Sequence, residues 1–156
     1  MNKSTSKKRI DIVKVQLVKE ASVFYQTESG KRAIVSPSDV AMTFKDFIGE
    51  SDREYFVVMC LNTKNEPTHL STVAIGALNK TIIHPREVFK VAILANAAAV
   101  IFCHNHPSGN TEPSLQDIEV TNRLYEAGEL LGIKVLDHVI IGDDFCSFKE
   151  KGYLSD

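Results

Sequence analysis

The sequence predicts a single domain of the α+β class. Its length of 156 residues suits one domain, because domains commonly hold roughly 100–200 residues. With 44% hydrophobic and 24% charged residues, it has the composition of a folded globular protein. Segments with the period of strands and segments with the period of helices are mixed, without the strict alternation that builds a parallel sheet. We therefore expect one hydrophobic core formed by a mixed set of strands and helices.

The first 35 residues predict a basic tail followed by two strands. Apolar and polar residues alternate over Ile10–Val18, and Val23–Thr27 continues the pattern after a short interruption. Glu28–Lys31 then has the composition of a turn. We expect residues 1–35 to form a tail and strands that pack on a domain formed by residues 36–156.

The next segments predict a helix and a hairpin. Ser36-Pro37-Ser38-Asp39 is typical of a helix start, and Gly49 of a helix end. The nearly continuous apolar run Glu54–Leu61 predicts a strand that is covered on both faces. Asn62–Asn65 predicts the hairpin turn, and Thr68–Leu78 the returning strand.

The second half predicts two helices and three strands. Pro85 suits a first helical turn, and the apolar spacing continues to about Ala97. A loop rich in proline and glycine, residues 107–113, separates a short buried strand from a long helix that Gly132 ends. The remaining predicted elements are a strand at Ala99–Cys103, a helix from about Ser114 to Leu131, and strands at Lys134–Ile141 and Phe145–Phe148.

No segment has the composition of a membrane span or a secretory leader. The longest apolar stretch, Val88–Cys103, is interrupted by Lys90 and Asn96 and is shorter than the roughly 20 residues that a bilayer requires. The first nine residues are polar and basic, without an apolar run. We therefore expect a cytoplasmic protein. Its three cysteines, an odd number, lie in apolar runs, which predicts buried, reduced thiols.

The charge distribution does not favour binding to nucleic acid. The net charge is −2, but four basic residues lie within the first nine positions, and the rest of the chain holds 14 basic against 20 acidic residues. Nucleic-acid affinity depends largely on lysine and arginine near the phosphates. Binding to nucleic acid is therefore not supported by charge.

The residues with the clearest chemistry are His104, His106 and Asp117. Side chains two apart on a strand point to the same face, so the two histidines can converge on one ion. A helix that begins at Ser114 would present Asp117 from its first turn. Two histidines and one carboxylate leave the fourth tetrahedral position open for water, as in a catalytic zinc site. Ser114, one turn before Asp117, is placed to donate to a developing oxyanion.

The spacing His-x-His-x7-Ser-x2-Asp resembles that of the JAMM (MPN-domain) zinc metallopeptidases. The longer text HNHPSGNTEPSLQD, with IHPREVFK before it and GELLGIKVLDHVIIGD after it, resembles the bacterial RadC branch over roughly Ser36–Tyr153. The resemblance implies an MPN/JAB-like, cytidine-deaminase-like mixed sheet flanked by helices. It also implies that His104, His106 and Asp117 bind Zn²⁺, and that Ser114 assists the tetrahedral intermediate.

The resemblance implies further that a glutamate near the start of an early strand activates the water. The matching position is Glu54, in Arg53-Glu54-Tyr55-Phe56. Glu87 is the competing base, although a glutamate in a first helical turn is already explained by the helix dipole. RadC proteins commonly carry a helix-hairpin-helix portion before this domain, and the corresponding 35 residues here have a different pattern.

Simpler structural interpretations remain for these residues. Ser114 and Asp117 also form a capping-box pattern, Glu54 fits a solvated strand edge, and Glu112 fits a loop surface. His138 lies outside the motif spacing and is either a partner of a ligand or a structural histidine. His69 and His84 also lie outside it.

Two functional hypotheses follow from the sequence. The first is a zinc-dependent metallohydrolase, a metallopeptidase or isopeptidase in which Glu54 is the general base. The alternative is a DNA-repair-associated or protein-binding module whose metal site is vestigial or structural. The sequence predicts no particular substrate and no oligomeric state.

Overall fold

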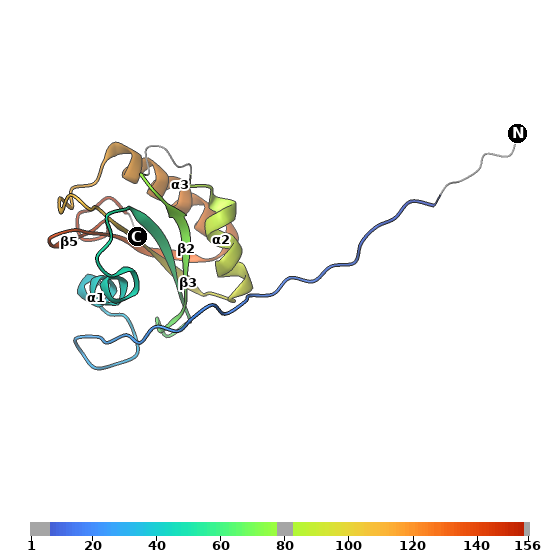
Figure 1. Ribbon diagram of the computed structural model, residues 1–156, viewed down its shortest axis with the longest axis horizontal. Helices are drawn as coiled ribbons and strands as arrows, with labels where there is room; N and C mark the ends of the chain where they lie inside the picture. The colour runs from blue at the N-terminus through green and yellow to red at the C-terminus, as the bar shows by residue number, and fades with distance from the viewer. Residues whose placement is uncertain (1–6, 78–82, 155–156) are drawn as a thin grey trace, which may run out of the picture.

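The computed structural model describes residues 7–77 and 83–154. These residues form a mixed five-stranded sheet with three helices, which confirms the predicted α+β class (Figure 1). In chain order the elements are α1 (Pro37–Ile48), β1 (Tyr55–Leu61), β2 (Pro67–Ile75), α2 (Pro85–Leu94), β3 (Ala99–Asn105), α3 (Leu115–Leu131), β4 (Lys134–Ile141) and β5 (Phe145–Ser147).

The strand order in the sheet is β2-β1-β3-β4-β5. β1 pairs antiparallel with both β2 and β3, while β3 pairs parallel with β4 through the crossover helix α3. β5 returns antiparallel beside β4. The two central strands β1 and β3 are buried along almost their whole length, as their continuous hydrophobicity predicts.

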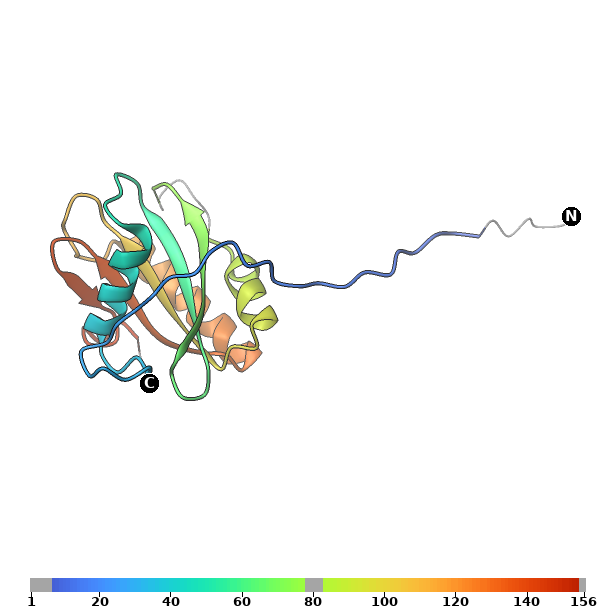
Figure 2. The same cartoon turned by 60° about the horizontal axis from the view of Figure 1, so that its bottom comes forward.

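The helices cover both faces of the sheet (Figure 2). α1 packs on one face, where Phe44 contacts a cluster that includes Val57 and Ile101. α2 and α3 pack on the other face, where Phe89 and Leu124 belong to a second apolar cluster. The side chains of β1 and β3 alternate between these two clusters, so the central strands hold the domain together from both sides.

Helices α1 and α3 begin with the same local structure. Ser36 and Ser114 are the N-caps, and each accepts a hydrogen bond from the backbone of an aspartate three residues later, Asp39 or Asp117. Each aspartate in turn accepts from the backbone of its N-cap residue, which completes a capping box. Both helix starts are confirmed, and so are the ends at Gly49 and Gly132.

The strands predicted at Ile10–Val18 and Val23–Thr27 are wrong. The described residues 7–27 contain no strand. The N-terminal part of this segment extends away from the domain, while its later part lies against the domain, where Thr27 is buried (Figure 1). Ile10 and Ile12 are 91% and 101% exposed. The alternating pattern indicates an extended backbone, but a strand also requires a partner that satisfies its amides, and no described strand pairs with this segment.

Smaller differences concern element ends. α2 ends at Leu94 instead of continuing to Ala97, because Asn96 adopts a left-handed φ of 51° that stops the helix. β3 extends past Cys103 to Asn105, so it includes His104. β2 ends at Ile75, and Leu78, the predicted end of that strand, lies outside the described residues.

The cysteines lie in the apolar interior of the domain. The three thiols are free and buried, as predicted, and burial raises the pKa of Cys60 to about 11. Within residues 7–77 and 83–154, no helix has the length and apolar character needed to cross a bilayer.

Candidate metal centre

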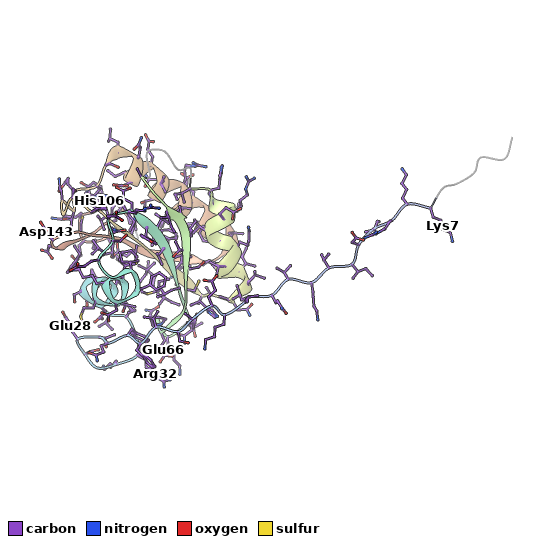
Figure 3. The ribbon with its side chains drawn as sticks, in the orientation of Figure 1. Lys7, Glu28, Arg32, Glu66, His106 and Asp143 are labelled. Atoms are coloured by element: carbon purple, nitrogen blue, oxygen red, sulfur yellow. The ribbon has the colours of Figure 1, made fainter. Side chains whose placement is uncertain are left out.

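Three ligand-type side chains meet where β3 ends and α3 begins. His104 is the penultimate residue of β3, His106 follows the strand directly, and Asp117 lies in the first turn of α3. One atom from each residue lies within 4.8 Å of the others. Figure 3 shows His106 at one end of the domain, near Asp143, while Glu66 in the β1–β2 turn lies at the opposite end.

The separations between these atoms suit a single ion. His104 Nε2 lies 2.8 Å from His106 Nε2, and 3.4 Å from Asp117 Oδ1. His106 Nε2 lies 3.5 Å from Asp117 Oδ2. A tetrahedral zinc ion with bonds near 2.0–2.1 Å separates its ligand atoms by about 3.3 Å. The residues present therefore fit a zinc ion.

The loop after β3 sets the orientation of His106. The Nδ1–H of His106 donates to the carbonyl oxygen of Asn110 at 2.7 Å, which leaves the Nε2 lone pair directed at the site. Gly109 allows the tight return of this loop with a φ of 87°, and its carbonyl accepts from the Asp143 amide at 2.9 Å. The loop is thus fixed against the β4–β5 turn, and His106 with it.

The surroundings of the two histidines shift their pKa values in opposite directions. Burial lowers the pKa of His104 from 6.5 to about 4, so this imidazole is neutral near pH 7. The hydrogen bond with the Asp117 carboxylate raises the pKa of His106 above 6.5.

The Asp117 carboxyl group is ionised although it is buried. Burial raises its pKa, but the hydrogen bond from His106 outweighs this effect, and the pKa falls below 3.8. The backbone N–H of Ser114 adds to the stabilisation by donating to Oδ2 at 2.7 Å. Without an ion, therefore, a proton on His106 partly takes the place of the cation.

Glu54 lies beside the three ligand residues. In the β1–β3 pairing, Phe56 is opposite His104, and continuing this antiparallel register by two residues places Glu54 opposite His106. The half-buried Glu54 also contributes to the raised pKa of His106 through its charge. The position matched by resemblance is therefore next to the site in the structure.

Asn105 ties the Glu54 segment to β3. Its side-chain nitrogen donates to the carbonyl oxygen of Arg53 at 2.8 Å, and its side-chain oxygen accepts from the Tyr55 amide at 2.7 Å. The two bonded residues are the neighbours of Glu54 on each side. The Glu54 carbonyl accepts from the Gly76 amide at 2.8 Å. The backbone of Glu54 is thus held from both neighbouring strands.

Ser114 occupies the exposed side of the site. Its hydroxyl oxygen accepts from the Asp117 amide at 3.1 Å, which is the capping interpretation. Because a hydroxyl also carries one donor hydrogen, capping leaves Ser114 able to donate to a substrate. The structure therefore accommodates both roles that the sequence suggested.

The other acidic residues considered from the sequence lie outside the ligand group. Glu87 is exposed in the first turn of α2, where it pairs with Lys90 at 2.9 Å. Glu112 is exposed in the loop. Sequence reasoning missed Asn105 and also Thr121, whose hydroxyl lies 2.6 Å from Nδ1 of His138, and it left His138 undecided. The available signal for Thr121 was its position four residues after Asp117, on the same side of the helix.

Comparison with known proteins places this geometry in a family. The model of the RadC-like JAB domain matches residues 34–153, which is most of the chain. The chain belongs to the RadC family. Together with the His-His-Asp group, the JAB domain fits a metal hydrolase of the JAMM kind.

Curated RadC relatives resemble the chain over most of its length. A UPF0758 protein of Rubrobacter xylanophilus is 53% identical over 125 residues, covering 80% of this chain and 55% of the relative. UPF0758 protein RBAM_025090 of Bacillus velezensis is 50% identical, with coverages of 85% and 58%. UPF0758 protein YsxA of Bacillus subtilis is 47% identical, with coverages of 90% and 65%. The chain thus spans little more than half the length of the first two relatives.

Proposed function

We propose that this RadC domain is a zinc-dependent hydrolase that cleaves a peptide or isopeptide bond. The observation that carries the proposal is the convergence of His104 Nε2, His106 Nε2 and the Asp117 carboxylate, with atoms 2.8–3.5 Å apart. A cluster of this kind leaves one tetrahedral position open, as catalytic zinc sites do. The JAB family match supports the same class of reaction.

In this proposal His104, His106 and Asp117 bind the ion and fix its position. When bound, zinc lowers the pKa of water and polarises a carbonyl group. Glu54 accepts the proton of the attacking water and passes it to the leaving amine, which is general acid–base catalysis. Ser114 donates its hydroxyl hydrogen toward the carbonyl oxygen as negative charge develops there.

The exposure of the site supports access by a substrate. The side chains of His104 and Asp117 are 0% and 3% exposed, whereas that of His106 is 15% exposed. Glu54 is half-buried and Ser114 is exposed. A substrate would therefore reach the ligand group from the side of His106, Glu54 and Ser114, since His104 and Asp117 are buried.

The partner that we propose is a peptide or protein substrate. Apart from the four basic residues in the first nine positions, the chain holds more acidic than basic residues, which disfavours a phosphate backbone. Salt-dependent duplex binding by the purified protein, together with no hydrolysis of any peptide or isopeptide library, would support the DNA-associated module instead.

The test combines metal analysis with hydrolysis of peptide and isopeptide libraries. We expect one zinc ion per chain, and loss of both zinc and turnover in the Asp117→Ala variant. Glu54→Gln should keep zinc but lose turnover by about 10²–10⁴-fold, the usual contribution of a general base. Glu87→Gln is the matched control, because it neutralises an exposed glutamate outside the ligand group and should leave turnover unchanged. A fully active Glu54→Gln variant would remove Glu54 from the mechanism.

A further inference from the structure

A line of buried hydrogen bonds runs from the backbone of α3 to the metal centre. The hydroxyl of Thr121 lies 2.6 Å from the carbonyl oxygen of Asp117 and 2.6 Å from Nδ1 of His138. Nδ1 of His104 lies 2.8 Å from Nε2 of His138. Each of these four residues is at most 2% exposed, so water does not compete for the bonds.

The direction of every bond in this line is fixed at its first member. A backbone carbonyl can only accept a hydrogen bond, so the hydroxyl of Thr121 donates its single hydrogen to the carbonyl oxygen of Asp117. Toward His138, therefore, Thr121 can only accept, and Nδ1 of His138 must carry a hydrogen. A neutral imidazole has one N–H, so Nε2 of His138 is an acceptor. It can then accept only from an Nδ1–H on His104.

The surroundings of His138 keep this ring neutral. It stacks on Phe148 with centroids 4.5 Å apart, and its ring is 5.5 Å from Phe56 and 6.2 Å from Phe102. His138 is fully buried among these aromatic rings, and burial in such surroundings penalises a positive charge on the imidazole. A doubly protonated His138 would reverse the last bond and put a hydrogen on the metal-facing nitrogen of His104.

We propose that Thr121 and His138 are positioning residues that hold His104 as the Nδ1–H tautomer, with the bare Nε2 facing the metal. The inference rests on the proposed metal site and assigns two residues that act on it through His104. His106 reaches the same state separately, through its bond to the Asn110 carbonyl. In both imidazoles, Nδ1 is thus hydrogen-bonded away from the site and Nε2 is the nitrogen that faces it.

The chain contains its own control for the threonine. In α1, Thr43 donates to the carbonyl oxygen of Asp39 at 2.9 Å, as Thr121 does to Asp117. Thr43 is equally buried, at 2%, but no described histidine is hydrogen-bonded to it. Removing the hydroxyl of Thr43 thus reproduces the local helix effect on the other face of the sheet, without touching the tautomer.

The experiment compares Thr121→Val, Thr121→Ser and Thr43→Val in the full chain. The first readout is zinc affinity, measured by competition with a chelator. The second is the protonation of each ring nitrogen of His104, measured by ¹⁵N NMR on the zinc-free protein at pH 8. In the parent protein, Nδ1 of His104 should be protonated and Nε2 bare.

Thr121→Val should weaken zinc binding about 10–100-fold, the usual effect of losing a group that orients a ligand. It should also replace the single tautomer of His104 by a mixture. Thr121→Ser and Thr43→Val should behave like the parent in both readouts. Should Thr121→Val fail to fold, His138→Gln and His138→Leu decide, because only the glutamine can still accept from His104.

Two results would overturn the inference. One is parent zinc affinity in Thr121→Val, or in His138→Leu if the first variant does not fold. The other is weaker binding with the His104 tautomer unchanged, which would show a purely structural role. A parent protein that binds no zinc would overturn the proposed function instead, while the zinc-free NMR spectrum would still test the tautomer.

Discussion

Substituting Asn105 by alanine should displace Glu54 relative to the histidines without removing a metal ligand. The Asn105 side chain is the connection between β3 and the two residues on either side of Glu54. It lies between His104 and His106 in sequence but bonds to the β1 segment instead of the ligand group. The Asn105→Ala variant should therefore keep zinc and lose turnover.

The size of the effect follows from the two bonds that are lost, at 2.7 and 2.8 Å. Each hydrogen bond contributes about 0.5–1.5 kcal/mol net, so the free energy of unfolding should fall by about 1–3 kcal/mol. For a domain of this size, a loss of 2 kcal/mol lowers Tm by about 4–8 °C. A displacement of Glu54 by about 1 Å would lower turnover about 100-fold.

Asn62 offers a matched control at the far end of β1. Its side-chain oxygen accepts from the amides of Lys64 and Glu66 at 2.9 and 3.0 Å, and its side-chain nitrogen donates to the Glu66 carboxylate. The Asn62→Ala variant should lose comparable stability but keep full turnover. Thermal unfolding, zinc content, hydrolysis and hydrogen exchange at the Tyr55 amide distinguish the two variants.

The reasoning about Asn105 fails under either of two outcomes. Parent turnover in Asn105→Ala would show that Glu54 does not depend on this connection. Equal losses of turnover in Asn105→Ala and Asn62→Ala would show that activity follows stability alone.

Three further predictions concern the loop, the pH dependence and the core. Gly142→Ala should weaken zinc binding, because the new Cβ would clash with the Gly109 carbonyl oxygen and displace the loop that orients His106. Chelator competition measures the affinity, and parent affinity would contradict this prediction. Asp117 raises the pKa of His106, and below that pKa zinc must displace a proton from this imidazole. Zinc affinity should therefore fall about tenfold per pH unit as the pH decreases. An affinity that stays constant between pH 8 and 5 would show that His106 does not set the pH dependence. Leu124 lies on the buried face of α3, and Leu124→Ala should lower the free energy of unfolding by about 2–5 kcal/mol in urea titration; a loss below 1 kcal/mol would mean that the cavity collapses.

The sequence was most informative where local chemistry decides the structure. Ser114 and Asp117 predicted both the start of α3 and the place of a carboxylate, because a capping box involves only residues three apart. The His-x-His spacing predicted that the two rings converge, because strand side chains alternate with a period of two. These residues account for the predicted ligand group.

Features that depend on partners distant in sequence were missed or mistaken. The alternation over Ile10–Val18 indicated a strand, yet pairing depends on an available edge, which the pattern does not specify. The contact between His104 and His138 depends on the β3–β4 register, in which Phe102 lies opposite His138. No local spacing encodes that register, so the sequence left the role of His138 open.

The starts of α1 and α3 share the sequence pattern Ser-x2-Asp-x3-Thr, but the two aspartates have different surroundings. Asp39 caps its helix, whereas Asp117 caps its helix and also belongs to the ligand group. Both carboxylate oxygens of Asp39 are saturated by backbone amides, those of Glu28, Val35 and Ser36. Among the described residues, Asp117 accepts from one backbone amide, that of Ser114, and its other carboxylate oxygen lies 3.4 Å from Nε2 of His104. Asp39 is thus an internal reference, a carboxylate whose two oxygens are already occupied by hydrogen bonds. Added metal should shift the NMR signals of Asp117 and leave those of Asp39 unchanged.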